Sequence, residues 1–506
     1  MADSESSESR KDEADNHSQT SRLLTLFDDL QGEAFRSHDD KPLVCYTDRG
    51  RRKTVPLTQA MRFLCLAYYR MTGQAVSSRS KDAVQNLLAA MADDGPKRQT
   101  WIRIAEHEGD LYLDLGNEDW SVIRITPNGW SLLDESPVHF LRPSSQLPLP
   151  MPERGELIDE LFNFVNLPDR KSQALALAWL VSTFRPNRPL PLLMIVGKSG
   201  SAKSTTAEIL SRIIDPKKTV LRTKPSDAQT VMVGACNGWV LGYDNLSSIP
   251  DWLSDLLCCI STGASSTART LYTDTGETVF EAQRPVILTS IEDVAQRSDL
   301  LDRAVILNLP PVEDSTRRIQ AEVMADFHKA HGRILGAVLD AVSAALANLP
   351  NTRPKMLPRM ADFACWAIAA ESALGLSPGE YMTAYAENRL DSCAQALEAC
   401  PIVEPLGRCF ANLSEWTGTA SDLLDELEKR ATKQQREHRR WPKDSTRLSG
   451  ELLRIAPNLW LAGLEVRQFR ESNHGRRRLI QIAKREEAEL GQRLQQRHQT
   501  QAQLVD

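Results

Sequence analysis

Apolar and polar residues recur with two different periods along the first third of the chain. Between 39 and 150, apolar residues have helical spacing over 57–71 and 81–91. Short β-type runs predict four strands, at 100–104, 111–115, 121–125 and 130–133. We expect a small α+β domain here, followed by a proline-rich linker at 143–152.

Short apolar runs and helical patterns alternate in the next region, 151–312. Helical spacing covers 156–164, 171–184 and 206–214. The apolar runs that predict strands lie at 189–196, 219–221, 239–243, 284–288 and 305–309. Strands that alternate with helices predict an α/β core for this region.

Helical periodicity dominates the following region, 313–400. Three stretches with cap signals predict long helices, at 317–349, 358–374 and 378–398. No strand pattern interrupts them. The region is therefore expected to be a helical unit placed after the α/β core.

The pattern changes again in 401–484. An amphipathic helix is predicted at 420–430, and a second helix runs from 441 to 455. Two strands, at 464–469 and 477–482, then flank a turn. Two helices followed by a two-stranded wing are typical of a winged helix-turn-helix DNA-binding domain.

The two ends of the chain lack such patterns. Residues 1–38 are rich in serine and acidic residues and poor in aromatic residues, which predicts a disordered acidic tail. Residues 485–506 are rich in glutamine, arginine and glutamate and are expected to form a frayed or disordered tail.

Composition restricts the class of protein. The net charge of −6 argues against a basic nucleic-acid coat protein but allows a local basic patch. Nine scattered cysteines without a C-x-x-C pair predict a reduced, cytoplasmic protein. No apolar stretch reaches the roughly 20 residues that span a bilayer, and no signal pattern begins the chain, so no membrane partner is expected.

A glycine-rich loop joins the strand at 189–196 to a helix. It reads Gly197-Lys198-Ser199-Gly200-Ser201-Ala202-Lys203-Ser204-Thr205, nearly the Walker A spacing. Small residues let backbone N–H groups surround an anion, and the helix adds its positive N-terminus. Lys203 is expected to reach the phosphates of ATP, and Ser204 to bind Mg²⁺. The alternative is a chance glycine- and serine-rich turn before a helix.

One residue departs from the Walker A pattern. Ala202 stands where a second glycine is usual. A Cβ atom is tolerated there only where φ stays negative, because left-handed backbone favours glycine. We therefore expect a negative φ at Ala202.

An apolar strand that ends in an acid follows about forty residues later. The strand at 239–243 runs into Asp244-Asn245, and we expect it to lie beside the phosphate-loop strand. Asp244 would then hold Mg²⁺ through its water shell, although strand-then-Asp alone is usually a turn. Asn245 occupies the position of a second, water-activating acid in many motor ATPases. An amide orients water but takes no proton, so no general base is identified.

Three further polar residues fit nucleotide chemistry. Thr289 follows a strand and is expected to touch the γ-phosphate or the attacking water, the role called sensor 1. Arg303 precedes the last predicted strand, where a ring ATPase places an arginine finger; the alternative is an ion pair with Asp299 or Asp302. Arg359 is a candidate second phosphate sensor or a helix-start arginine in an ion pair.

Two carboxylates in the N-terminal region were weighed as a metal pair of a primase-type polymerase. Asp110 and Asp114 fall on one face of a predicted strand, but Tyr112 separates them and no third ligand is evident. We expect exposed strand carboxylates instead. Histidines and cysteines do not cluster at metal-ligand spacing, so no zinc site is expected.

Positive charge is concentrated near the C-terminus. Between 429 and 485 there are sixteen Lys and Arg residues against five Asp and Glu residues. Arginines on the candidate recognition helix and wing are expected to meet DNA: Arg447, Arg454, Arg470, Arg476, Arg477 and Arg478. The alternative is a basic solvated face used for protein contacts.

These features together resemble the AAA+ helicase-type ATPases of phages and integrative elements, including the helicase halves of phage primase-helicases. Their order is the phosphate loop, Asp244-Asn245, a hairpin around 274–276, Thr289, Arg303, a helical lid and a basic winged helix. Ala202-Lys203-Ser204 looks like the phosphate-loop variant of minichromosome-maintenance helicases. The resemblance implies ATP and Mg²⁺ as cofactors, DNA as partner and a hexameric ring.

The sequence therefore predicts a cytoplasmic, ATP-dependent DNA helicase or DNA-remodelling ATPase in phage or mobile-element replication. Primase or other replication proteins are candidate partners. The first alternative is an ATP-switched replication initiator or regulator without processive unwinding, which the acidic hairpin tip favours. The second is a P-loop kinase with a nucleic-acid-binding appendage.

Overall fold

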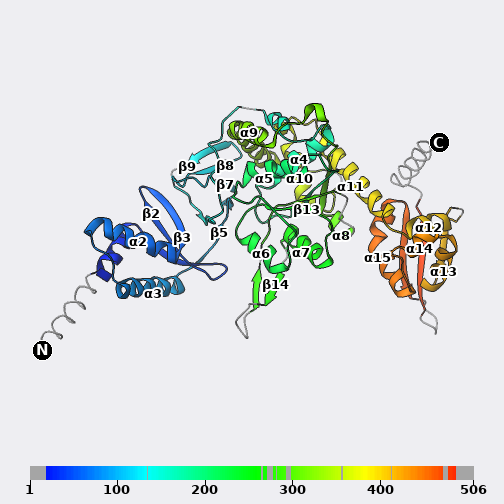
Figure 1. Ribbon diagram of the computed structural model, residues 1–506, viewed down its shortest axis with the longest axis horizontal. Coiled ribbons are helices and arrows are strands. Elements are labelled where there is room, and N and C mark those ends of the chain that lie inside the picture. Colours follow the sequence, from blue (N-terminus) through cyan, green and yellow to red (C-terminus); the bar gives the residue numbers. More distant parts are fainter. Residues whose placement is uncertain are drawn as a thin grey trace.

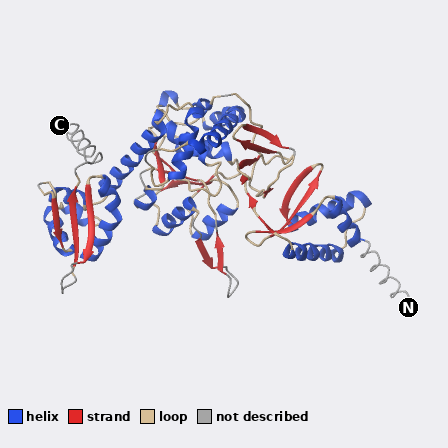
Figure 2. Ribbon diagram, turned by 180° about the vertical axis from the view of Figure 1, so that it is seen from behind, coloured by secondary structure: helices blue, strands red, loops and turns tan. Residues whose placement is uncertain are grey.

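The computed structural model describes residues 19–133, 135–155, 157–263, 266–269, 277–280, 282–291, 298–354, 357–411, 413–470 and 477–485. Three parts follow one another along the chain, and Figure 1 shows the N-terminal and C-terminal parts at opposite ends of a central α/β part. Figure 2 shows the same order from behind, with strands in all three parts.

A five-stranded parallel sheet forms the central part. Its strands are β11 (Leu192–Val196), β12 (Leu221–Arg222), β13 (Leu241–Leu246), β16 (Val286–Ser290) and β17 (Ala304–Asn308). They lie in the order β12-β13-β16-β11-β17, and each neighbouring pair is parallel. β11 and β16 are buried along their whole length, as in sheets covered on both faces. The predicted α/β class is confirmed.

The strand order corrects one expectation. The strand that carries Asp244, β13, was expected beside the phosphate-loop strand β11. Instead β16 lies between them, because β11 pairs with β16 on one side and with β17 on the other. An apolar run identifies a buried strand but does not specify its neighbours.

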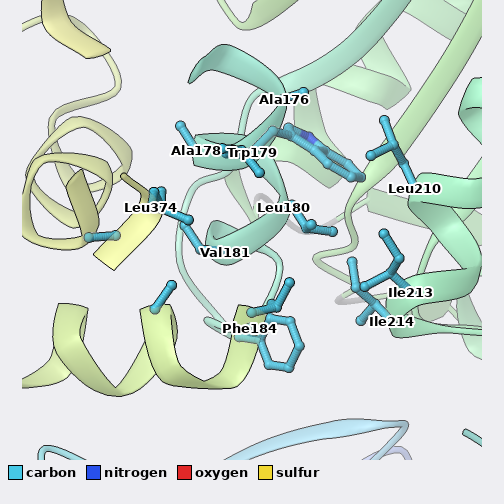
Figure 3. Close-up of a cluster of buried hydrophobic side chains, with 14 of the residues drawn as sticks. Ala176, Ala178, Trp179, Leu180, Val181, Phe184, Leu210, Ile213, Ile214 and Leu374 are labelled. Carbon is cyan, nitrogen blue, oxygen red and sulfur yellow. The ribbon is translucent and has the colours of Figure 1, made fainter. Parts of the chain in front are cut away.

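Helices cover both faces of the sheet. α6 (Ala228–Cys236), α7 (Asp251–Thr262) and α8 (Ser298–Leu301) share a hydrophobic cluster with alternate residues of β11 and β16. α4 (Arg170–Ser182) and α5 (Lys203–Ile214) pack on the other face. Figure 3 shows part of this second cluster, where Trp179 of α4 and Ile213 of α5 are buried. Successive strand residues thus enter opposite cores.

The helices expected to form a separate lid belong to this second cluster. They are α9 (Gln320–Asn348), α10 (Ala361–Ala370) and α11 (Glu380–Glu398), close to the predicted bounds. Short 3-10 turns accompany them and precede α4: η1 (Ile158–Asn163), η2 (Asp314–Thr316), η3 (Leu349–Asn351) and η4 (Glu371–Leu374). Because their apolar faces pack on α4 and α5, the structure does not separate 313–400 from the α/β core.

One helix, Gln320–Asn351, is long and apolar enough to cross a membrane by length and composition. Its most apolar window is 61% buried inside the protein. Packing against the sheet and its helices accounts for this composition, because a core helix is apolar around most of its surface.

The helix α11 connects two hydrophobic cores. Near its middle, Asn388 accepts a hydrogen bond from the Ile306 backbone N–H (3.0 Å) and donates one to the Ile306 carbonyl oxygen (2.6 Å). The amide thereby replaces a strand neighbour at the free edge of β17. Tyr385 packs in the central core, whereas Leu397, three turns later, packs in the C-terminal core.

The N-terminal part begins with a helix over 19–29 and a four-stranded sheet. Its elements are β1 (Glu33–Ser37), β2 (Pro42–Asp48), β3 (Arg51–Pro56), α2 (Leu57–Thr72), α3 (Ser78–Asp94) and β4 (Lys97–Arg98). The disordered tail predicted for 1–38 is therefore wrong for residues 19–38. Leu23 and Phe27 are buried against α2 and α3, which the polar composition of the segment concealed.

A second small sheet joins this part to the centre. It contains β6 (Ile104–His107), β7 (Asp110–Asp114), β8 (Val122–Thr126) and β9 (Gly129–Leu133), and β5 (Thr100–Trp101) pairs separately with β10 (His139–Phe140). The Trp130 indole N–H donates to Asp340 of α9 at 2.8 Å, and Ser343 donates to the Thr126 carbonyl oxygen at 2.6 Å. These contacts fix the sheet on α9.

The sequence predicts exposed carboxylates on β7, and the structure corrects this prediction. Asp114 is fully buried and binds Arg142 at 2.5 Å and Gln146 at 2.9 Å. Asp110 pairs with Arg124 on β8 at 2.5 Å. Each carboxylate is thus neutralised by a cation, and among the described residues no three His, Cys, Asp or Glu side chains are placed to hold a metal ion.

The C-terminal part has its own core. It contains α12 (Val403–Cys409), β18 (Glu415–Gly418), α13 (Ala420–Arg430), α14 (Lys433–Glu437), α15 (Ser445–Leu461), β19 (Leu464–Arg470) and β20 (Arg478–Lys484). β20 lies between β18 and β19. α13 has the predicted bounds, but α15 continues past the predicted end at 455 with Pro457 inside it.

The predicted hairpin lies partly outside the described residues. β14 (Ser266–Arg269) pairs antiparallel with β15 (Glu277–Phe280). The sequence before the turn, Leu271-Tyr272-Thr273, predicts the first strand of the hairpin, whereas the described strand lies earlier. Both 271–273 and the tip at 274–276 are outside the residues that the structure describes.

Candidate functional site

The phosphate-loop sequence forms a tight turn between β11 and α5. Gly197 begins the turn where a Cβ atom would lie 2.6 Å from both the Leu309 carbonyl oxygen and the Ser201 hydroxyl oxygen. Gly200 has φ +81°, a conformation that side chains rarely adopt. The loop therefore needs glycine at both positions, one for a close approach and one for backbone geometry.

Ala202 adopts a left-handed conformation with φ +57° and ψ +28°, directly before α5. The expected negative φ is wrong. Such a conformation costs an alanine about 1 kcal/mol relative to glycine. The surrounding hydrogen bonds hold it in place, including the Thr206 N–H that donates to the Ala202 carbonyl oxygen at 2.9 Å.

Lys203 is the first residue of α5. Its Nζ donates to the Lys198 carbonyl oxygen at 3.0 Å and so spans the loop. Partial burial lowers the pKa of Lys203, and the nearby Asp244 carboxylate opposes this shift. The ammonium group thus lies across the loop opening, where an incoming phosphate would replace the carbonyl contact.

Three elements bring polar side chains together beside the loop. Ser204 of α5 donates to Asp244 Oδ1 at 2.8 Å, and Thr289 at the end of β16 donates to the same oxygen at 2.5 Å. The Asn245 backbone N–H donates to Thr289 Oγ1 at 2.8 Å. Asn245 itself is exposed and has φ +53°. The inserted strand β16 therefore supplies the hydroxyl that orients Asp244.

The donor atoms at this point suit a hard divalent cation. Ser204 Oγ and the Asp244 carboxylate are oxygen ligands, the type that Mg²⁺ prefers, and it usually keeps several waters. Both side chains are at least partly accessible. The residues present therefore fit the metal that the sequence predicts.

Replacing Asp244 with alanine is expected to lower Mg²⁺-dependent ATP turnover by about a hundredfold or more, because the metal would lose its oriented carboxylate. Steady-state phosphate release by the full-length chain measures this. Asp159→Ala, which removes an exposed carboxylate of η1, is the control and should leave turnover unchanged. Normal turnover in Asp244→Ala would place the metal-binding acid elsewhere.

Arg303 and Arg359 do not join this cluster within one chain. Ala304 pairs with Leu192 at the start of β11, so Arg303 lies at the amino edge of the sheet. The phosphate loop lies at the carboxyl edge, about one strand length, or about 17 Å, away. Arg303 therefore lies away from the phosphate loop of its own chain, and the expected contact with a neighbour's site remains a prediction.

Arg359 is an ion-pair residue in the structure. Its guanidinium contacts Asp302 at 3.0 Å, and Arg389 contacts the other oxygen of Asp302 at 3.4 Å. The structure contains the alternative, an ion pair just before the helix, and the phosphate-sensor role of Arg359 stays a prediction. Asp302 is accordingly occupied by these two arginines.

Sequence reasoning missed Asn166. Its side-chain amide donates to the Ser201 carbonyl oxygen at 3.0 Å and to the Pro310 carbonyl oxygen at 2.8 Å. It therefore fastens the phosphate loop to the segment after β17. A single asparagine in the loop before α4 carries no periodicity or spacing that would have identified it.

The predicted DNA-contacting arginines lie on α15 and the β19–β20 hairpin. Arg470 and Arg478 are exposed and directly opposite each other in the hairpin, and Arg477 is exposed beside them. Opposed like charges repel, which favours a bound anion between or beside them. Arg476 is outside the described residues.

The two arginines of α15 have acidic neighbours. Arg447 is exposed and lies 3.4 Å from Asp444, the helix N-cap. Arg454 contacts Glu451, which also binds Arg440 at 3.2 Å. Arg454 is therefore partly neutralised, and of the two only Arg447 lies near the start of the helix.

Two family models match consecutive regions of the chain. Residues 158–392 match the actinomycete integrative conjugative element replication protein, AICE RepA, and residues 402–498 match the AICE RepA C-terminal domain. Together they span about two thirds of the chain in the order of a single protein. The chain is therefore similar to AICE RepA over these two regions. A replication protein of a mobile element is thereby confirmed as its general class.

The two regions matched by the AICE RepA models contain the candidate nucleotide site and the basic hairpin. The first matched region contains the central sheet, the phosphate loop and the Asp244 cluster, and the second contains the basic hairpin. The N-terminal part, before residue 158, lies outside both matches. No curated protein matches the chain.

Two solved structures of one protein region are distantly similar to this chain. One apo structure of the NrS-1 C-terminal region is 11% identical with a TM-score of 0.39, covering 91% of this chain and 99% of that one. Another is 12% identical with a TM-score of 0.37 and covers 91% and 98%. At such TM-scores these matches support no statement about fold or activity.

Proposed function

We propose that this protein is a cytoplasmic, Mg²⁺-dependent AAA+ ATPase that unwinds or remodels DNA during replication of an integrative element. The observation that carries the proposal is the meeting of Ser204, Asp244 and Thr289 beside the phosphate loop. The two family models, which describe a replication protein, support the link to DNA. Primase or other replication proteins of the element would be its partners.

Each residue of the site has a distinct part in this reaction. Backbone N–H groups of the loop and Lys203 bind the phosphates of ATP, while Ser204 and Asp244 would hold Mg²⁺. The metal supplies positive charge to the phosphate oxygens. Thr289 keeps Asp244 in position, and the amide of Asn245, the next residue, would orient the attacking water. Positioning and charge stabilisation therefore account for the catalysis.

A ring explains the position of Arg303. At the amino edge of its own sheet it lies away from its own phosphate loop, and in a ring it would enter the site of a neighbouring copy. Such head-to-tail contacts close into rings, and a hexamer is the proposed assembly. Arg303 would then stabilise the charge on the transferring phosphate in the neighbour.

DNA contact is proposed for the C-terminal part. The sequence of α13, α15 and the β19–β20 hairpin supports a winged helix, with α15 as recognition helix. Arg470, Arg477 and Arg478 would bind phosphates along the hairpin. Arg447, near the start of α15, would contact base edges.

An ATP-switched replication initiator without processive unwinding is the second candidate. Asn245 favours it, because an amide in the position of a second acid cannot take a proton from water. Slow hydrolysis would suit a protein whose ATP state controls assembly on DNA.

Strand displacement distinguishes the two candidates. The full-length chain with ATP and Mg²⁺ is expected to separate a forked DNA duplex, and Lys203→Ala, which cannot use ATP, should not. A gel or fluorescence assay measures the released strand. DNA-dependent ATP hydrolysis without strand release would favour the initiator, whereas absence of ATP hydrolysis would refute both candidates.

A further inference from the structure

The segment after β17 passes directly over the phosphate loop. The Leu309 N–H donates to the Val196 carbonyl oxygen at 2.8 Å, which continues the sheet by one residue. The Val312 N–H then donates to the Gly200 carbonyl oxygen at 3.0 Å, in the middle of the loop. Together with the Asn166 contacts, these bonds attach residues 309–312 to the loop backbone.

Arg317, at the end of this segment, reaches back to the loop. Its Nη2 atom would lie 3.4 Å from a Cβ atom on Gly200. The same nitrogen donates to the Val312 carbonyl oxygen at 3.3 Å and lies 3.1 Å from Asp314. The guanidinium group is thereby held beside the loop by its own segment.

The ion pair of Arg317 is easily exchanged. The side chains of Arg317 and Asp314 are 57% and 92% exposed. An exposed pair of this kind contributes little, since solvent screens both charges. A multiply charged phosphate is a stronger partner for a guanidinium group, because it can accept two parallel hydrogen bonds.

We propose that Arg317 contacts the phosphates of a nucleotide bound in the same chain; this rests on the proposed nucleotide-binding function of the loop. Lys203 would approach the phosphates from the start of α5, and Arg317 would approach them from the segment after β17, beside Gly200. It is distinct from Arg303, which lies at the other edge of the sheet. The absence of a side chain at Gly200 leaves room for the guanidinium group.

The test compares two adjacent arginines in the full-length chain. Arg317→Ala is expected to weaken binding of Mg-ATP about tenfold, the loss of one charge-assisted contact, and Arg317→Lys less so. Arg318→Ala is the matched control: Arg318 pairs with Asp326 at 2.5 Å and is similarly exposed. Isothermal titration calorimetry measures the affinities, and thermal melting checks that all variants are folded.

Tripolyphosphate, which lacks base and sugar, identifies the group that is contacted. Arg317→Ala is expected to weaken the binding of tripolyphosphate by about the same factor as the binding of ATP. Affinities within twofold of wild type would overturn it, as would a loss confined to ATP. Lys203→Ala distinguishes a failure of the Arg317 proposal from a failure of the proposed nucleotide-binding function. If that variant also bound ATP normally, the phosphate-loop function itself would be wrong.

Discussion

Replacing Lys203 with alanine is expected to abolish ATP hydrolysis and to weaken nucleotide binding by about a hundredfold or more. Lys203 is the cation that spans the loop, and its pKa shift reflects the partly desolvated environment where phosphate charge would be neutralised. Removing it leaves the phosphates to the backbone N–H groups and Arg317. Phosphate release and calorimetric ATP binding on the full-length chain measure the two effects.

Lys218→Ala is the control for this variant. Lys218 follows α5 and its side chain is exposed, so its loss should change neither turnover nor melting temperature. Turnover near wild type in a folded Lys203→Ala protein would mean that the loop between β11 and α5 does not bind ATP.

Replacing Arg470, Arg477 and Arg478 together with alanine is expected to weaken DNA binding for all sequences alike. Each phosphate contact releases about one counterion when it forms, and the triple variant would lose three contacts. The slope of log K against log salt concentration should therefore become shallower by about three units. Fluorescence anisotropy across a salt series measures affinity and slope in one experiment. ATP hydrolysis without DNA should remain unchanged.

Arg467→Ala tests whether position on the hairpin matters. Arg467 lies on β19 like Arg470 but on the opposite face, and it pairs with Glu465 at 2.9 Å. The Arg467→Ala variant should therefore change the slope of log K against log salt concentration little. An unchanged slope in the triple variant would show that other residues hold the DNA.

Local sequence patterns predicted those site residues that are marked by their immediate neighbours in the chain. The glycine spacing before Lys203, the apolar strand before Asp244 and the strand end at Thr289 each predict a residue from its immediate neighbours. The structure brings these three together. The strand order could not be predicted, because pairing in a parallel sheet depends on tertiary packing and not on the strand's own apolar pattern.

Contacts between distant segments also could not be predicted from the sequence, because they depend on tertiary packing. Asn166 lies outside every repeating pattern and bonds to a backbone carbonyl of the loop. Arg317 stands at the start of the helix predicted over 317–349, and that pattern gives no sign of its place beside Gly200. Ala202 was expected at negative φ from intrinsic preference, yet the loop's hydrogen bonds override that preference at a cost of about 1 kcal/mol. Helical periodicity likewise predicted α9–α11 but not the core that they enter.

The shared helix α11 has a mechanical consequence. At about 28 Å from end to end, it is a stiff rod rather than a flexible tether. Asn388 clamps it to the edge strand that leads from Arg303 to Arg317, and Leu397 anchors its far end beneath α15. A small tilt of α11 about Asn388 would therefore also move the C-terminal part that contains the basic hairpin.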